Sequence, residues 1–96
     1  MVAVVIEVKT RPSENIAFMD PEMLFNRSLY AMSSWPGFIK DSFEYSDDNL
    51  TQTRVMTWET FEHFTSPVLS PEQQEWSEKN KKWYSDHNFT INYIFS

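Results

Sequence analysis

One histidine carries the side chain best suited to proton transfer near neutral pH. His63 lies in a short segment that could form a helical turn, residues 59–65. A neutral imidazole in a pocket could act as a general base or orient a polar substrate. A surface or capping histidine on a short helix is the alternative. We carry His63 forward as a candidate catalytic residue.

Arg54 is the second candidate catalytic residue. It is the only Lys or Arg between Asp41 and Glu78, a segment with nine carboxylates. A guanidinium donates several hydrogen bonds in a fixed plane, so Arg54 could hold an anionic or enolate substrate. Pairing with Asp41 or Glu44 across a hairpin is the alternative.

Three further residues are candidates for substrate binding: Trp58, Asp41 and Tyr93. Trp58 ends a predicted strand, where its ring would either wall an apolar pocket or pack into the core. Asp41 interrupts an apolar strand face, so its carboxylate is either buried and perturbed or placed near the open end of the strand in water. Tyr93 shares a strand face with Ile91 and would either point into a cavity or belong to the core.

The composition excludes several classes of function. The chain has 96 residues, a net charge of −6 and no cysteine. Nucleic acids and anionic membranes attract clustered basic residues, so neither is an expected partner. Disulfides and cysteine-based metal sites are excluded, and no apolar run reaches the roughly 20 residues that cross a bilayer. We expect one domain over residues 1–96, without a signal peptide and in the cytoplasm.

Hydrophobic patterning predicts four strands. The first is dense in β-branched residues, the two central ones alternate between apolar and polar side chains, and the last alternates aromatic or aliphatic with polar residues. The two central strands are separated by an Asp-Asp-Asn turn, so they form a hairpin. The predicted strands cover residues 2–9, 39–45, 51–58 and 89–95.

Capping residues predict two main helices. Asp20 followed by Pro21 is a strong helix start, and the apolar spacing beyond it continues to a predicted end near Ser34. The second helix starts at Ser70, which has Gln73 at the reciprocal position of a capping box. The chain therefore has the order strand–helix–strand–strand–helix–strand.

This order predicts an α+β, ferredoxin-like βαββαβ fold. Right-handed crossovers place both helices on one face of a four-stranded antiparallel sheet. The aromatic content of 17% suggests that the other face is too apolar to stay in water. We expect a homodimer in which two sheets pack face to face as an α/β barrel. Residues expected on that open face are Val5, Phe43 or Ser42, Met56 and Ile94.

Three short motifs carry a resemblance to a known family. They are WPGFI at residues 35–39, TWE at residues 57–59 and HFTSP at residues 63–67. In these motifs and in element order, the chain resembles the antibiotic-biosynthesis-monooxygenase (ABM)-like family of dimeric α/β-barrel proteins. The haem-degrading branch of that family has an Asn on its first strand. This chain offers Glu7 there instead, so haem degradation is not expected.

The resemblance implies a cofactor-independent oxygenase. In that chemistry an electron-rich phenolate or enolate substrate supplies the electrons to oxygen, so neither a cofactor nor a metal is expected. The protein provides a dry pocket, a base and hydrogen-bond donors. His63, Arg54, Trp58 and Tyr93 would fill these roles.

A second function stays open beside the enzyme, because fold does not determine chemistry. The protein would then be a non-catalytic dimeric module that binds a small apolar ligand or serves as an accessory protein. The substitution His63→Ala separates the two. It would abolish oxygen uptake with a polycyclic phenol if His63 is the base, and it would leave ligand affinity unchanged in a binding module.

Overall fold

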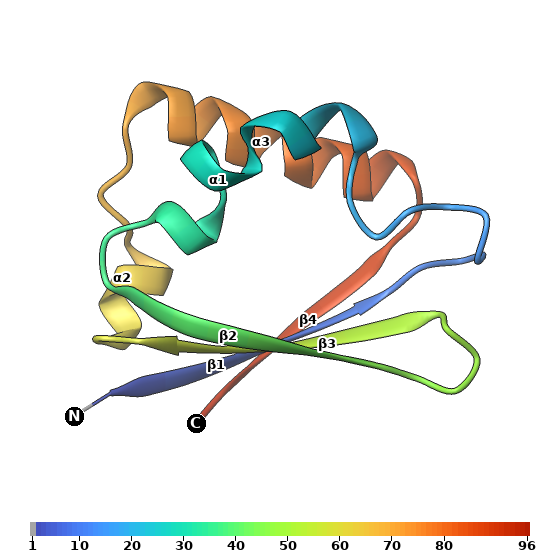
Figure 1. The fold of residues 1–96 in the computed structure, drawn as a ribbon, viewed down its shortest axis with the longest axis horizontal. Coiled ribbons are helices and arrows are strands. Elements are labelled where there is room, and N and C mark those ends of the chain that lie inside the picture. The colour runs from blue at the N-terminus through green and yellow to red at the C-terminus, as the bar shows by residue number, and fades with distance from the viewer. Residues whose placement is uncertain (1) are drawn as a thin grey trace.

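Four strands form one antiparallel sheet in the computed structural model, which describes residues 2–96 (Figure 1). The four predicted strands and the central hairpin are confirmed. The protein is α+β, and the sheet order is compatible with a ferredoxin-like fold. The strands are β1 (Ala3–Thr10), β2 (Phe38–Tyr45), β3 (Thr51–Trp58) and β4 (Thr90–Phe95), in the spatial order β2-β3-β1-β4.

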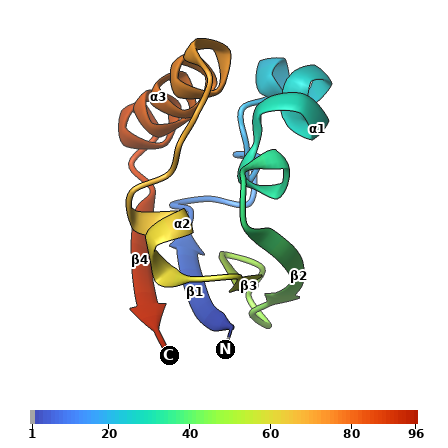
Figure 2. The same cartoon turned by 90° about the vertical axis from the view of Figure 1, so that its left-hand side faces the viewer.

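The two longer helical segments lie over the same face of the sheet, and within residues 2–96 no helix lies on the opposite face (Figure 2). The longest helix, α3 (Pro71–Asp86), begins with the predicted capping box. The Ser70 hydroxyl accepts a hydrogen bond from the Gln73 backbone at 3.1 Å, and the Gln73 side chain accepts one from the Ser70 backbone at 3.0 Å. The short helix α2 (Phe61–Thr65) follows β3 as predicted.

The predicted continuous helix from Asp20 to Ser34 is wrong in its continuity. The segment contains two 3-10 helices, η1 (Pro21–Asn26) and η2 (Met32–Ser34), on either side of the single-turn α1 (Arg27–Tyr30). Phe25 is 91% exposed, and Leu24 and Leu29 are also exposed, so of this apolar stripe only Ala31 and Met32 near its end pack against the rest of the protein. Short helices depend on packing of an apolar face, so this segment lacks what would keep it regular.

The sheet buries the opposite side chains from those expected. Val5 and Met56 were expected on the open face, but both are fully buried beneath the helices with Trp58 and Trp35. Trp58 of β3 packs there with Trp35, Phe38 and Phe64. Strand alternation then fixes which face each of the other residues of the strand occupies. Phe43, opposite Arg54, also lies on the helix side.

The open face carries β-branched residues from the central strands. Ile6 lies opposite Val55 on one side and Ile94 on the other, and Val4 and Val8 share its face. The expectation that Ile94 lies on this face is confirmed, and Ser42, which pairs with Val55, joins it.

Gly37 precedes β2 in a conformation that only glycine adopts easily. Its φ is +84°, and a Cβ built on it would overlap the imidazole ring of His63. Its carbonyl oxygen accepts a hydrogen bond from the Glu59 backbone at 2.8 Å, so the turn ties β2 to the end of β3. The close approach of Gly37 fixes the position of α2 beside the sheet.

We expect Gly37→Ala to lower the free energy of unfolding by about 2–3 kcal/mol, because left-handed strain and overpacking add together. Urea denaturation measures the loss. In a His63→Ala background the ring atoms are gone, so the same substitution should destabilise less. An equal loss in both backgrounds would show that the overlap with His63 contributes nothing.

Candidate functional site

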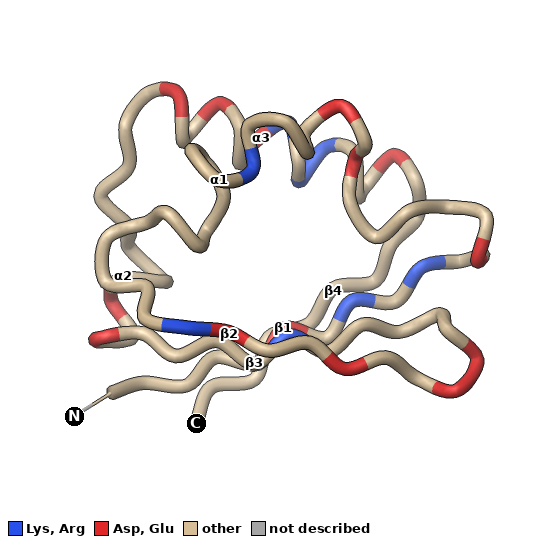
Figure 3. The backbone as a smooth tube through the Cα atoms, in the orientation of Figure 1, with Lys and Arg blue, Asp and Glu red and all other residues tan. Residues whose placement is uncertain are grey.

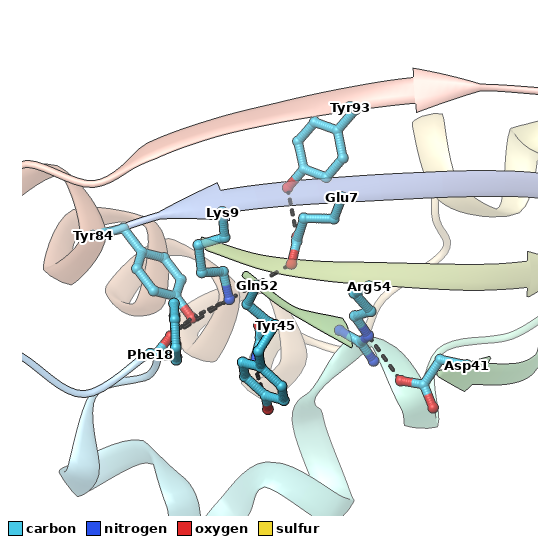
Figure 4. Close-up of polar contacts among 9 residues, drawn as sticks. All are labelled: Glu7, Lys9, Phe18, Asp41, Tyr45, Gln52, Arg54, Tyr84 and Tyr93. Carbon is cyan, nitrogen blue, oxygen red and sulfur yellow. Dashed lines mark hydrogen bonds and ion pairs between the residues drawn. The ribbon is translucent and has the colours of Figure 1, made fainter. Parts of the chain in front are cut away.

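Two charged side chains of β1 lie buried between the sheet and the helices. Glu7 is 3% exposed and Lys9 is 6% exposed. Strand alternation places them on the same face as the core residue Val5 (Figure 4). Burying charged groups costs several kcal/mol each unless they are paired. Their partners therefore define the site.

Two tyrosines connect these charges to the helix layer and to the last strand. The Tyr93 hydroxyl donates to Glu7 Oε2 at 3.1 Å. The Lys9 ammonium donates to the Tyr84 hydroxyl oxygen at 2.7 Å and lies 3.5 Å from Glu7 Oε1. Tyr84 in turn donates to the carbonyl oxygen of Phe18 at 2.8 Å. One network thus joins β4, β1, α3 and the loop after β1 (Figure 4).

Arg54 of β3 points to the same side of the sheet. It lies opposite Glu7 in the strand register and is 7% exposed. Its Nε donates to Asp41 Oδ2 at 2.8 Å, and the guanidinium lies between the rings of Phe38 and Phe43, with its Cζ 5.8 and 5.4 Å from their centroids. Within residues 2–96 this is the one hydrogen bond that Arg54 donates from its side chain. The two terminal nitrogens remain able to bind a ligand.

These side chains line a cavity of about 400 Å³ between the helices and the sheet. A volume of this order accommodates a small organic molecule. Much of the remaining lining is apolar, and Asn80 adds a buried Oδ1 that has no hydrogen-bond donor among the described residues. The apolar walls are Met19, Ala31, Met32, Trp35, Phe64, Pro67, Leu69, Trp76 and Ile91.

The charge of the cavity is opposite to that of the chain. Its charged lining residues are Lys9, Arg27, Arg54 and Lys81 against Glu7. The whole chain has 8 basic and 14 acidic residues, so half of the basic residues line this cavity but only one of the acidic ones. Figure 3 shows most acidic residues along the helices, around α2 and at the β2–β3 turn. The cavity is therefore a local basic region in an acidic protein.

Burial changes the ionisation of the network. Burial lowers the pKa of Lys9 below its ordinary value of 10.5, and the neighbouring Glu7 carboxylate opposes this shift in part. Burial, with the charge of Glu7, raises the pKa of Tyr84 and of Tyr93 well above the ordinary value of 10. The two tyrosines therefore keep their protons and act as hydrogen-bond donors. At a given pH, a larger fraction of Lys9 is uncharged than of an exposed lysine.

We expect stability to fall above about pH 10, where tyrosines ionise in the unfolded chain while Tyr84 keeps its proton in the folded one. The slope should reach about 1.4 kcal/mol per pH unit for this residue. Lys9 acts in the opposite sense. The pKa of Lys9 is lower in the folded chain than in the unfolded chain. Its contribution to the free energy of unfolding therefore rises with pH until about pH 10.5.

Urea denaturation at a series of alkaline pH values measures this slope. The matched variant is Tyr84→Phe, which loses stability at neutral pH with its hydrogen bonds but should show a shallower decline above pH 10. An unchanged alkaline slope in Tyr84→Phe would contradict the assignment.

The structure brings some of the predicted site residues together and separates others. Arg54 and Tyr93 line the cavity. Asp41 is the partner of Arg54, as the alternative interpretation of Arg54 had it. Trp58 is completely buried in the core against Trp35, Phe38 and Phe64 and does not line the cavity.

His63 lies apart from the cavity. Its Nδ1 is 2.8 Å from the Thr60 hydroxyl oxygen, and its Nε2 is 3.8 Å from Glu59. Thr60 caps α2 and also accepts a hydrogen bond from the His63 backbone. This position agrees with the alternative interpretation of His63 as a surface or capping residue on a short helix. The catalytic role of His63 stays a prediction.

Three residues of the network were missed in the sequence: Glu7, Lys9 and Tyr84. Glu7 and Lys9 stand out as charges inside an otherwise apolar strand, and they share alternation with Val5. Tyr84 follows Trp76 and Asn80 at intervals of four, which is one face of a helix. Both patterns are present in the sequence. They indicate site residues only once it is known which face of β1 is buried.

A larger hollow of about 640 Å³ lies between η1, α1 and α3. Five of its twelve lining residues are Asp or Glu, among them Asp20, Glu72 and Asp86. The two ion pairs along α3, Lys79–Glu75 and Lys82–Asp86, are exposed. Among its lining residues, only Trp76 is buried. We regard the basic cavity between helices and sheet, which is the less open of the two, as the candidate site.

The fold and the cavity define the chain as a small α+β protein with a partly open cavity between sheet and helices that is lined by more basic than acidic residues. No protein-family model matches the chain, and no curated protein matches it either. Within residues 2–96, no cluster of three or more acidic or histidine side chains is arranged to hold a metal ion. The same residues contain no helix that is both long and apolar enough to span a membrane.

Proposed function

We propose that this protein binds a small organic anion with an apolar body in the cavity between its helices and its sheet. The observation that carries the proposal is the segregation of charge, with four of the eight basic residues around the cavity in a chain of net charge −6. Buried charges stabilise a fold poorly. Two of the four, Lys9 and Arg54, are buried, and their place beside apolar lining residues therefore favours ligand binding as their role.

The chemistry of the lining supports a carboxylate or a similarly planar anion. The terminal nitrogens of Arg54 match two carboxylate oxygens, which gives a bidentate pair. Trp35 and Trp76 also line the cavity and offer flat apolar surfaces. Asn80 Oδ1 would accept a hydrogen bond from a hydroxyl or amine of the ligand.

Isothermal titration calorimetry with a matched pair of ligands tests the proposal. The anion 3-phenylpropionate and its neutral amide have nearly the same shape. We expect the anion to bind at least about tenfold more tightly, because charge-assisted hydrogen bonds are the stronger kind. Equal affinity for the two, or no binding of either, would overturn the proposal.

We also propose the ferredoxin-like topology and a homodimer formed through the open sheet face. Val4, Ile6, Val8 and Val55 are only partly covered there, and Ile94 is 53% exposed. A contiguous apolar face of this kind is typical of an interface. The resemblance to the ABM-like family agrees with such a dimer and remains part of this proposal.

Sedimentation velocity tests the dimer. We expect the wild-type chain to sediment as a dimer and Ile6→Lys as a monomer, since a lysine at the centre of the open face would be buried against its own copy. The substitution leaves the helix side of the sheet untouched. A wild-type monomer at micromolar concentration would exclude this assembly.

The oxygenase suggested by the resemblance remains a second candidate. The observation in its favour is a cavity with an apolar wall that also holds Arg54 and Tyr93, two of the residues expected to act on the substrate. Oxygen uptake with a polycyclic phenol would support it. Uptake that survives in His63→Ala would assign the base to another residue.

A further inference from the structure

Lys9 differs from every other lysine of the chain in its surroundings. Lys40, Lys79, Lys81 and Lys82 are exposed, whereas Lys9 is 6% exposed, so Lys9 is the one buried lysine of the two, Lys9 and Lys81, that line the cavity. A primary amine held in an apolar cavity is a nucleophile when it is uncharged. Lysine is also the residue that forms imines with carbonyl compounds.

The groups around the Lys9 amine are arranged for proton transfer. The Tyr84 hydroxyl lies 2.7 Å from Nζ, and the Glu7 carboxylate lies 3.5 Å from it. Glu7 also accepts a hydrogen bond from Tyr93, so its position is fixed from the other side. A carboxylate within reach of the amine can take up its proton and return it.

Arg54 of β3 is a diagonal neighbour of Lys9 of β1. Glu7 is directly opposite Arg54 in the register, and Lys9 is two residues further along the same face. Diagonal neighbours of this kind are roughly 7–8 Å apart at the backbone. A single small molecule can therefore contact the guanidinium with one end and the amine with the other.

We propose that Lys9 forms an imine with the carbonyl carbon of an oxo acid whose carboxylate is held by Arg54. This inference rests on the proposed anion site and names its ligand class, an oxo acid with an apolar side chain. The apolar side chain would lie against Trp35 and Trp76.

The step balances without any further reactant. The uncharged Nζ attacks the carbonyl carbon, a C–N bond forms, and the carbonyl oxygen becomes a hydroxyl. Glu7 accepts the first proton lost by Nζ and passes it to that oxygen. Glu7 then accepts the second Nζ proton and passes it to the same oxygen. The C–O bond breaks, the oxygen leaves as water with both amine protons, and a C=N bond remains. Burial, which lowers the pKa of Lys9, increases the fraction of amine able to react.

Reductive trapping tests the inference on the full chain. Phenylpyruvate with sodium cyanoborohydride should add one stable adduct per chain, and peptide mapping by mass spectrometry should place it on Lys9. Phenylacetone, which has the ketone but no carboxylate, should label Lys9 at least about tenfold more slowly, because it lacks the ion pair with Arg54. Lys9→Arg should lose the adduct, whereas Lys82→Met should keep it. Mapping on the wild-type chain gives the answer even if Lys9→Arg fails to fold.

The possible results separate this inference from the proposed function. Adducts spread equally over the exposed lysines would overturn the imine. Binding of 3-phenylpropionate without any adduct from phenylpyruvate would overturn the imine and leave the anion site standing. Equal labelling of Lys9 by phenylpyruvate and phenylacetone, with no binding of 3-phenylpropionate, would overturn the oxo-acid assignment together with the anion site.

Discussion

Replacing Arg54 with methionine lowers the affinity for 3-phenylpropionate by roughly 10- to 100-fold, the effect of losing a charged hydrogen-bond donor in a buried site. Arg54 is 7% exposed and uses only Nε on Asp41 among the described residues. The remaining guanidinium nitrogens would bind the carboxylate. Calorimetric titration of the folded variant measures the change.

The matched control is Asp41→Asn, which removes the carboxylate of the ion pair but keeps the guanidinium. Asp41 does not line the cavity, so its replacement should leave the affinity unchanged or raise it. The reverse pattern, with Asp41→Asn reducing the affinity and Arg54→Met leaving it intact, would show that the ion pair only stabilises the hairpin.

Replacing Trp58 with alanine lowers the free energy of unfolding by about 3–5 kcal/mol, as large-to-small changes of buried aromatic residues do. Trp58 is completely buried, and its ring packs against Trp35, Phe38 and Phe64 at centroid distances of 6.1, 5.2 and 5.6 Å. A small domain has only about 5–15 kcal/mol in total. Urea denaturation should therefore show a variant close to unfolding.

The control for this substitution is Trp58→Phe. It keeps an aromatic ring and removes the indole Nε1, a buried donor that has no acceptor within residues 2–96. Losing an unsatisfied polar group offsets part of the lost packing, so we expect a smaller loss than for alanine. A loss as small for Trp58→Ala as for Trp58→Phe would mean that Trp58 contributes little to the core.

Local sequence signals predicted much of the fold. The capping box at Ser70 and Gln73 depends on neighbouring residues alone, and the structure reproduces it. The hairpin of β2 and β3 follows from alternation on either side of a polar turn. The first helical region failed because its apolar spacing suggested packing that the structure does not provide. Phe25 shows this most clearly, since its ring stays in solvent.

The buried face of β1 could not be predicted from that strand alone. Val4, Ile6 and Val8 form the more apolar face, yet Val5, Glu7 and Lys9 are the residues beneath the helices. Long-range packing of β1 against β3 and the helices determines which face of β1 is buried. Arg54 was identified because it stood alone among acids. Glu7 and Lys9 became site residues only once this facing was known.

Chemical-shift mapping by NMR tests the central claim most directly. On titration with 3-phenylpropionate, we expect the largest changes at the Arg54 Nε–H and at the indole N–H groups of Trp35 and Trp76, which surround the cavity. Changes confined to the open sheet face around Ile6, or to α2 around His63, would contradict the account and place the ligand elsewhere.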